Sequence, residues 1–220
     1  QFHVLKSKNV EFELLTPPSL KAGIEMCADI DGVKQWTCYP TYNQYISLMQ
    51  LFEQEFPGLC KLYEFGQSID GRKLLAVKIS DNVEQEEEEP EFFYTSTMHG
   101  DETTGYVLML HLIDYLLNNY DTDSRISELI NTTEIWINPL SNPDGTYYSG
   151  NTTVSGATRF NSNGIDLNRN FPDIEDPNGN PGQGGTFQQE NLAMMDFLKN
   201  RHFVLSANFH GGVEVVNYPW

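Results

Sequence analysis

The chain has 220 residues, with 13 Lys and Arg against 31 Asp and Glu, which gives a formal net charge of −18 at pH 7. This length suits one domain with a sizeable hydrophobic core. The excess of acidic residues argues against nucleic acid and anionic membrane surfaces as partners, because both would repel the chain. No uninterrupted apolar run reaches the roughly 18 residues of a membrane span, so none is expected.

The cysteines and the N-terminus bear on where the protein works. Cys27 and Cys38 could close a small loop, but the compartment is unknown and the sequence leaves this disulfide open. Cys60 is expected to be a buried thiol. The chain starts at Gln1 without a signal-peptide pattern, which fits a mature secreted or periplasmic protein, or a trimmed chain.

Residues 1–35 carry no motif and are expected to form an N-terminal extension with one strand near residues 11–15. Residues 36–220 are expected to form the main domain. Its first helix is predicted over residues 41–56, because apolar residues recur there every three to four positions. Thr41 can cap this helix, and Pro57-Gly58 ends it.

Strands and helices alternate through the rest of the chain. Apolar and aromatic runs predict strands over residues 59–65, 73–80, 91–97, 133–139 and 203–209, the last of them buried. Asp70-Gly71 predicts a hairpin turn between the first two strands. Helical periodicity predicts helices over residues 103–118, 124–130 and 188–200. This alternation favours an α/β layer fold with a largely parallel central sheet.

Three side chains that can bind metal follow the ends of predicted strands. His99 follows the strand at 91–97, Glu102 opens the next helix, and His210 follows the strand at 203–209. Open α/β sheets bind ligands at this edge, so the three side chains are expected to converge. Two imidazoles and one carboxylate leave the fourth position of tetrahedral zinc free for water, which is the pattern of a catalytic zinc site.

The order and spacing of six motifs resemble those of the zinc metallocarboxypeptidases, and within them the regulatory (N/E-like) branch. The resemblance implies a three-layer α/β/α fold with a mixed, mainly parallel central sheet. It also implies one Zn²⁺ bound by His99, Glu102 and His210. The motifs extend from about residue 36 to residue 220 and are Tyr39–Tyr42, Gly66–Arg72, His99–Glu102, Asn142–Gly145, Gly164–Pro172 and Asn208–Gly212.

The resemblance implies further roles for residues in a long stretch, 141–185, that is rich in Asn, Gly, Asp and Pro. Asp166 matches the carboxylate that orients the first zinc histidine. Asn168 and Arg169 match the pair that binds the terminal carboxylate of the substrate. Arg159 matches a second arginine, which stabilises the oxyanion that develops on the scissile carbonyl. The segment 142–145 is interpreted as a structural turn in the wall of the site.

The implied function is hydrolysis of the C-terminal peptide bond by metal-activated water, so the expected partner is the C-terminus of a peptide or protein. Family members also use a general-base glutamate and a closing tyrosine, both well after the second zinc histidine. Glu214 is too close to His210 to match, so both residues are expected after Trp220, and the chain is expected to be the N-terminal two-thirds of the domain.

Two alternatives stay open at this stage. One is a zinc amidase of similar fold that acts on cell-wall peptides or acyl-amino acids. The other is a relative that binds metal or peptide without catalysis.

Overall fold

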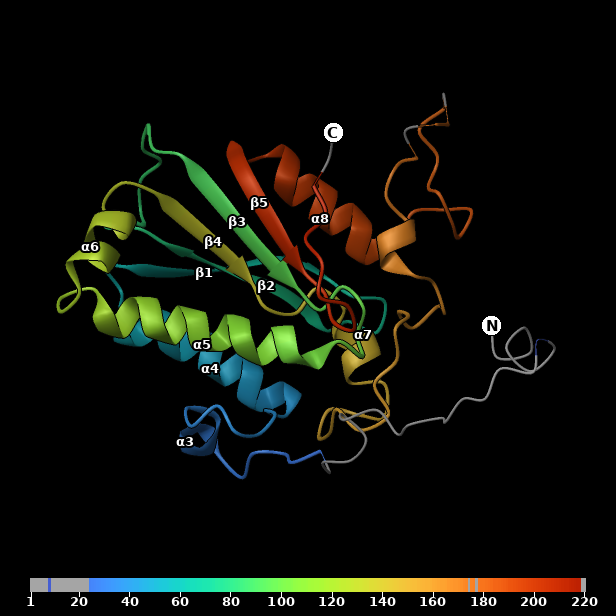
Figure 1. The fold of residues 1–220 in the computed structure, drawn as a ribbon, viewed down its shortest axis with the longest axis horizontal. Coiled ribbons are helices and arrows are strands. Elements are labelled where there is room, and N and C mark those ends of the chain that lie inside the picture. The colour runs from blue at the N-terminus through green and yellow to red at the C-terminus, as the bar shows by residue number, and fades with distance from the viewer. Residues whose placement is uncertain (1–7, 9–23, 174, 177, 219–220) are drawn as a thin grey trace.

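The central sheet has five strands in the order β1-β2-β4-β3-β5 (Figure 1). The computed structural model describes residue 8 and residues 24–173, 175–176 and 178–218, so the strand expected near residues 11–15 lies outside the described residues. Within them the strands are β1 (Cys60–Gln67), β2 (Lys73–Ile79), β3 (Glu91–Ser96), β4 (Glu134–Asn138) and β5 (Phe203–Phe209).

The sheet is mixed, as expected. β3 is parallel to both β4 and β5, whereas β2 is antiparallel to both β1 and β4. These strands therefore form two parallel and two antiparallel pairs, so the expected majority of parallel pairs is absent among them. The predicted hairpin accounts for one antiparallel pairing, and the second arises because β2 also lies against β4.

Helices cover both faces of the sheet, which confirms the three-layer α/β/α architecture (Figure 1). Helices α4 (Tyr42–Glu55) and α5 (Thr103–Asn119) lie over one face, and α8 (Gln189–Lys199) lies over the other. Helix α6 (Ser124–Ile130) follows α5. The sequence did not predict α3 (Ile30–Val33), α7 (Pro143–Thr146) or the 3₁₀ turn η1 (Leu167–Arg169), because elements this short show no periodicity.

Local chemistry and the alternation of strand residues explain this layering. Thr41 and Gln44 form a capping box at the start of α4, so the predicted cap is confirmed. On β2, Val77 belongs to the large core on the α4 and α5 side, while its neighbour Ala76 packs with Trp136 near α8. Successive strand residues point to opposite faces, so one strand supplies both cores.

Strand β5 is less buried than its apolar sequence predicts. Its side chains Val204 and Leu205 are 70% and 62% exposed. The reason is its position at the end of the strand order, where only β3 pairs with it among the described strands. The strand itself lies where predicted, but its predicted burial is wrong for this part of the chain.

Residues 24–35 pack against the main domain. Cys27 and Cys38 form a disulfide with a Cα–Cα distance of 5.1 Å, and Met26 bridges Tyr39 beside it. Cys27 and Val33 are both buried in the core with α4. No helix within the described ranges is long and apolar enough to span a membrane.

The buried Cys60 thiol generates a first prediction. It is 1% exposed, and burial raises its pKa to about 12. Because the thiolate is the reactive form, we expect Ellman's reagent at pH 8 to modify native Cys60 at least about a hundredfold more slowly than the unfolded chain. Thiol counting checks the disulfide as well: the unfolded 220-residue chain should show one free thiol before reduction and three afterwards. Fast native modification would contradict the burial.

Candidate metal centre

The parallel pairing of β3 with β5 brings the two histidine motifs of this sequence to one edge of the sheet. Ser96 at the end of β3 pairs with Phe209 at the end of β5. His210 follows Phe209 directly, and His99 lies three residues after Ser96, in the turn that leads into α5. Glu102 is the N-cap residue of α5, and its side chain makes no capping bond, which leaves it available to the histidines.

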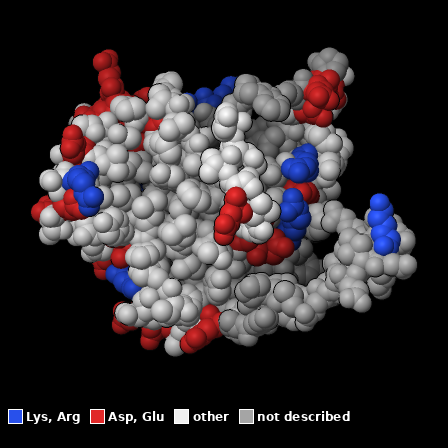
Figure 2. Space-filling model, in the orientation of Figure 1, with Lys and Arg blue, Asp and Glu red and all other residues white. Residues whose placement is uncertain are grey.

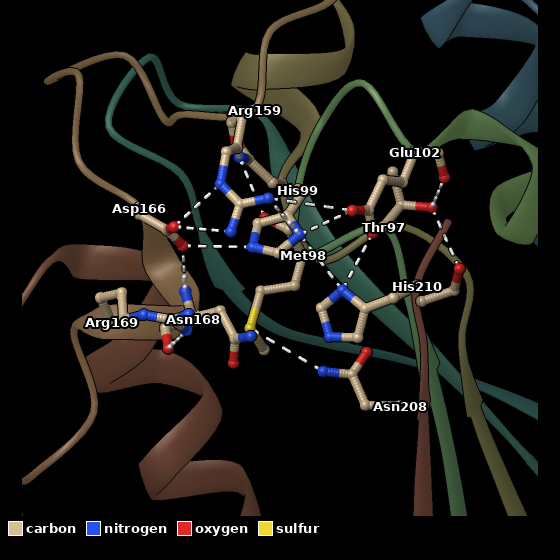
Figure 3. A network of polar contacts seen from close by, with 12 residues as sticks. Thr97, Met98, His99, Glu102, Arg159, Asp166, Asn168, Arg169, Asn208 and His210 are labelled. Atoms are coloured by element: carbon tan, nitrogen blue, oxygen red, sulfur yellow. Dashed lines mark hydrogen bonds and ion pairs between the residues drawn. The ribbon is translucent and has the colours of Figure 1, made fainter. Parts of the chain in front are cut away.

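His99, Glu102 and His210 converge as expected (Figure 3). Nδ1 of His99 lies 2.9 Å from Oε1 of Glu102, and Nδ1 of His210 lies 2.9 Å from Oε2 of the same carboxylate. The two Nδ1 atoms are 3.1 Å apart. Two ligands of a tetrahedral zinc lie about 3.3 Å from each other, given bond lengths of about 2.0–2.1 Å. Both the donor types and their spacing therefore fit a zinc ion.

Asp166 contacts the other ring nitrogen of His99, the one that does not face Glu102 and His210. Oδ1 of Asp166 is 3.2 Å from Nε2 of His99, and the same oxygen accepts a hydrogen bond from the backbone N–H of Asn168 at 3.0 Å. A carboxylate at Nε2 favours the tautomer that carries its proton there, which leaves the lone pair of Nδ1 available to a metal ion. The geometry is that of a histidine oriented for metal binding.

Arg159 reaches the same cluster from the loop between α7 and η1. Its Nε donates to Oδ2 of Asp166 at 2.9 Å, and its Nη2 lies 2.8 Å from that oxygen. Its Nη1 lies 3.2 Å from Nδ1 of His99 and 3.9 Å from Oε1 of Glu102. The guanidinium is thus fixed beside the three converging side chains while remaining 37% exposed to solvent.

Asn168 and Arg169 lie next to Asp166, on the short turn η1 (Figure 3). The Arg169 side chain is exposed, and its Nη1 donates to the backbone oxygen of Asn168 at 3.0 Å. Neither side chain contacts the histidines. The structure therefore places this pair at the edge of the cluster, free to meet a ligand, and does not bring it into the cluster.

The two carboxylates of the cluster are stabilised in their ionised forms. Burial raises the pKa of Glu102, but the contacts of its carboxylate with His99, with the backbone of Gly211 and with His210 together outweigh burial and hold this pKa below its ordinary value. Burial likewise raises the pKa of Asp166, and the hydrogen bond and charge of Arg159 outweigh it. Ionised carboxylates are the forms that bind a metal or orient a ligand histidine.

Sequence reasoning missed the polar side chains that hold η1 in place. Asn191 of α8 donates to the backbone oxygen of Leu167 at 2.9 Å, and Asn170 accepts from the backbone N–H of Gln188 at 2.6 Å. These contacts join residues about 20 positions apart, and polar residues at the start of a helix ordinarily indicate a solvated end. Nothing in the sequence pattern distinguishes the two cases.

Comparison with known proteins shows the family to which this chain belongs. The family model described as zinc carboxypeptidase (peptidase M14) matches residues 45–220. The chain belongs to the zinc carboxypeptidase family. Human carboxypeptidase D is 43% identical over 178 residues, and mouse carboxypeptidase M is 42% identical over 176 residues.

Carboxypeptidase family members also share the fold. The structure of carboxypeptidase A from Helicoverpa armigera superposes with a TM-score of 0.73 at 21% identity, covering 96% of this chain and 58% of that one. At this identity the likeness concerns the fold alone. The match to human carboxypeptidase D covers 78% of this chain and 12% of that protein, and the match to mouse carboxypeptidase M covers 76% and 37%. The chain thus spans a minor part of these relatives.

The convergence of three donors generates a second prediction. We expect His210→Ala to lower zinc content from one ion per chain toward zero after dialysis, because two remaining ligands hold zinc poorly. His111→Ala is the matched control: this exposed histidine lies on α5 and stacks on Trp36, with the ring centroids 4.9 Å apart. The control should retain full zinc. Metal analysis that found equal zinc in both variants would exclude His210 as a ligand.

Proposed function

We propose that this chain forms the metal-binding part of a zinc-dependent metallocarboxypeptidase, which hydrolyses the C-terminal peptide bond of peptides or proteins. The convergence of His99, Glu102 and His210 beside the Arg159 guanidinium is the observation that carries the proposal. Three side chains that can bind zinc and one guanidinium lie close together there, which supports hydrolysis of a peptide bond by metal-activated water.

The proposed division of roles follows the contacts. His99, Glu102 and His210 hold the zinc, and Asp166 keeps the imidazole of His99 in the orientation and tautomer that binding needs. Zinc supplies Lewis-acid polarisation of the scissile carbonyl and a lowered pKa for water. Arg159 offers Nη hydrogen atoms near the metal ligands, where the carbonyl oxygen gains negative charge during the reaction.

The exopeptidase character of the proposed enzyme rests on Asn168 and Arg169. A guanidinium binds a carboxylate through two parallel hydrogen bonds, and a neighbouring amide can add a third. Arg169 is exposed at the edge of the cluster, and its guanidinium has donors beyond the Nη1 hydrogen that binds the Asn168 oxygen, which supports this contact. A substrate held by its terminal carboxylate would present its last peptide bond to the metal.

The proton-accepting glutamate stays a prediction. Glu214 is exposed in the described segment that follows His210, and Glu102 is already engaged with both histidines. The assignment of a glutamate after Trp220 therefore rests on the family resemblance.

We further propose that the protein works in an oxidising compartment, as a secreted or periplasmic protein. The Cys27–Cys38 disulfide supports this location, because such bonds are rare in the reducing cytosol of most organisms. The net charge of −18 supports the absence of nucleic-acid partners. The acidic side chains visible in Figure 2 lie mainly around the margin of that face and are interspersed with basic ones.

A third prediction tests the carboxylate clamp. We expect the full-length, zinc-loaded protein to cleave blocked dipeptides with a free C-terminus and to cleave amidated ones with a much higher KM. Arg169→Ala should lose most of this preference, by about ten- to a hundredfold, since a charge-assisted bidentate contact contributes about 1.5–3 kcal/mol. Arg125→Ala is the control, because this exposed arginine pairs with Asp123 on α6. Equal cleavage of free and amidated substrates would overturn the exopeptidase proposal.

A fourth prediction separates the two arginines. We expect Arg159→Ala to lower kcat by about a hundredfold or more with little change in KM, because a contact to the developing oxyanion forms mainly in the transition state. Steady-state kinetics on the free-carboxylate substrate measure this. A rise in KM at constant kcat would show that Arg159 binds the ground state instead.

A further inference from the structure

Asn142 lies between the loop that carries His99 and the loop that carries Arg159, and its side chain is fully buried. Its Oδ1 accepts a hydrogen bond from the backbone N–H of Gly145 at 2.9 Å, which caps α7. Its Nδ2 donates to the backbone oxygen of Met98 at 3.2 Å and to that of Arg159 at 3.3 Å. One amide therefore joins the residue before His99 to the main chain of Arg159.

The backbones around this amide touch one another. The N–H of Gly100 also donates to the Arg159 oxygen at 3.3 Å, and the N–H of Thr158 donates to the Gly145 oxygen at 2.9 Å. A Cβ added to Gly100 would lie 2.4 Å from the backbone carbon of Gly145, and one added to Gly145 would lie 2.5 Å from the backbone oxygen of Phe160. The loops leave no room for a side chain at either glycine, so the two main chains are in direct contact there.

The main chain of Asn142 also holds a strained residue. Its N–H donates to the backbone oxygen of Thr97 at 3.1 Å. Thr97 has a φ of +57°, which is unfavourable for a β-branched residue. Such a conformation persists only where its surroundings fix it, and here it sets the turn from β3 to His99.

Arg159 needs such an anchor because no helix or strand contains it. The chain between α7 and η1 has no regular secondary structure, and the Arg159 side chain is long. Asp166 fixes the guanidinium end of that side chain, while the amide of Asn142 and the N–H of Gly100 fix its main-chain end. Both ends of Arg159 are thus held by hydrogen bonds, with Nη1 at 3.2 Å from Nδ1 of His99.

We propose that Asn142 is a positioning residue for Arg159: its side-chain amide ties the Arg159 main chain to the His99 turn and so sets where the guanidinium meets the substrate. The inference rests on the proposed function. Asn142 does not touch the substrate itself, and its contribution passes through Arg159.

Asn142 has two roles that can be separated. Its Oδ1 caps α7, whereas its Nδ2 binds the Met98 and Arg159 oxygens, and two variants test the Nδ2 contacts. Asn142→Ser keeps a side-chain oxygen that can cap α7, but it lacks the amide that reaches the Met98 and Arg159 oxygens. Asn142→Asp keeps both the size and the capping oxygen, and places a carboxylate oxygen against the two carbonyls. Asn138→Asp is the matched control, because Asn138 is also fully buried and donates to the backbone oxygen of Leu75, away from the arginine.

The experiment measures kcat, KM and zinc content of the full-length, zinc-loaded protein on the free-carboxylate substrate. We expect Asn142→Ser to lower kcat about ten- to a hundredfold, the loss typical of a misplaced catalytic group, with KM within about twofold and zinc retained. If Asn142→Ser fails to fold, as judged by circular dichroism, Asn142→Asp takes its place. The Asn138→Asp control should keep kcat within about threefold, even if its melting temperature falls.

A double-mutant cycle supplies the readout that a merely structural role would not produce. In the Arg159→Ala background, Asn142→Ser should cost less than about threefold in kcat, because the group that it positions is gone. An undiminished effect in that background, an unchanged kcat in the single variant, or a loss explained by missing zinc would overturn the inference. If the parent protein shows no preference for free over amidated ends, the proposed function itself fails. If the parent behaves as proposed and only the cycle is additive, this inference alone fails.

Discussion

The parallel register of β3 and β5 is the constraint on which the metal centre depends. Ser96 pairs with Phe209, so His99 and His210 leave the sheet at the same edge and their Nδ1 atoms come within 3.1 Å. A slip of one residue would move His210 by about 3.3 Å along the strand and turn its side chain to the other face. Metal–ligand distances vary by only about 0.2 Å, so a slipped register could not bind zinc through both histidines.

The charges around this edge are balanced pairwise. Glu102 faces the two histidines, while Asp166 divides its oxygens between His99 and Arg159. An unpaired guanidinium so close to the ligands would repel a metal cation. Because Asp166 pairs with Arg159, a carboxylate compensates the positive charge of the guanidinium beside His99 and Glu102.

The long segment between β4 and α8 contains little regular secondary structure. Buried polar contacts hold its described residues in place. Asp144 in α7 accepts hydrogen bonds from Ser68 Oγ and from Arg72 Nη1, both at 2.7 Å, so the β1–β2 hairpin turn is fixed to the site wall. Asn142 donates to the backbone oxygen of Arg159, which precedes η1, and Asn191 donates to that of Leu167, the first residue of η1. Among the described residues of this segment, these bonds satisfy main-chain groups that a loop would otherwise leave to water.

The sequence by itself determined where the main helices and strands lie and which kinds of side chain follow the strand ends at the site. Helical periodicity placed α4, α5, α6 and α8, and apolar or aromatic runs placed all five strands, each within two residues of its observed ends. The motif spacing placed His99, Glu102 and His210 after strand ends. What only the tertiary structure decided was the antiparallel share of the sheet, the exposure of β5 and the role of Asn142 as a bridge between two loops. These depend on which strands become neighbours and which distant carbonyls come within reach of an amide, and local residue patterns carry no record of contacts between segments far apart in the chain.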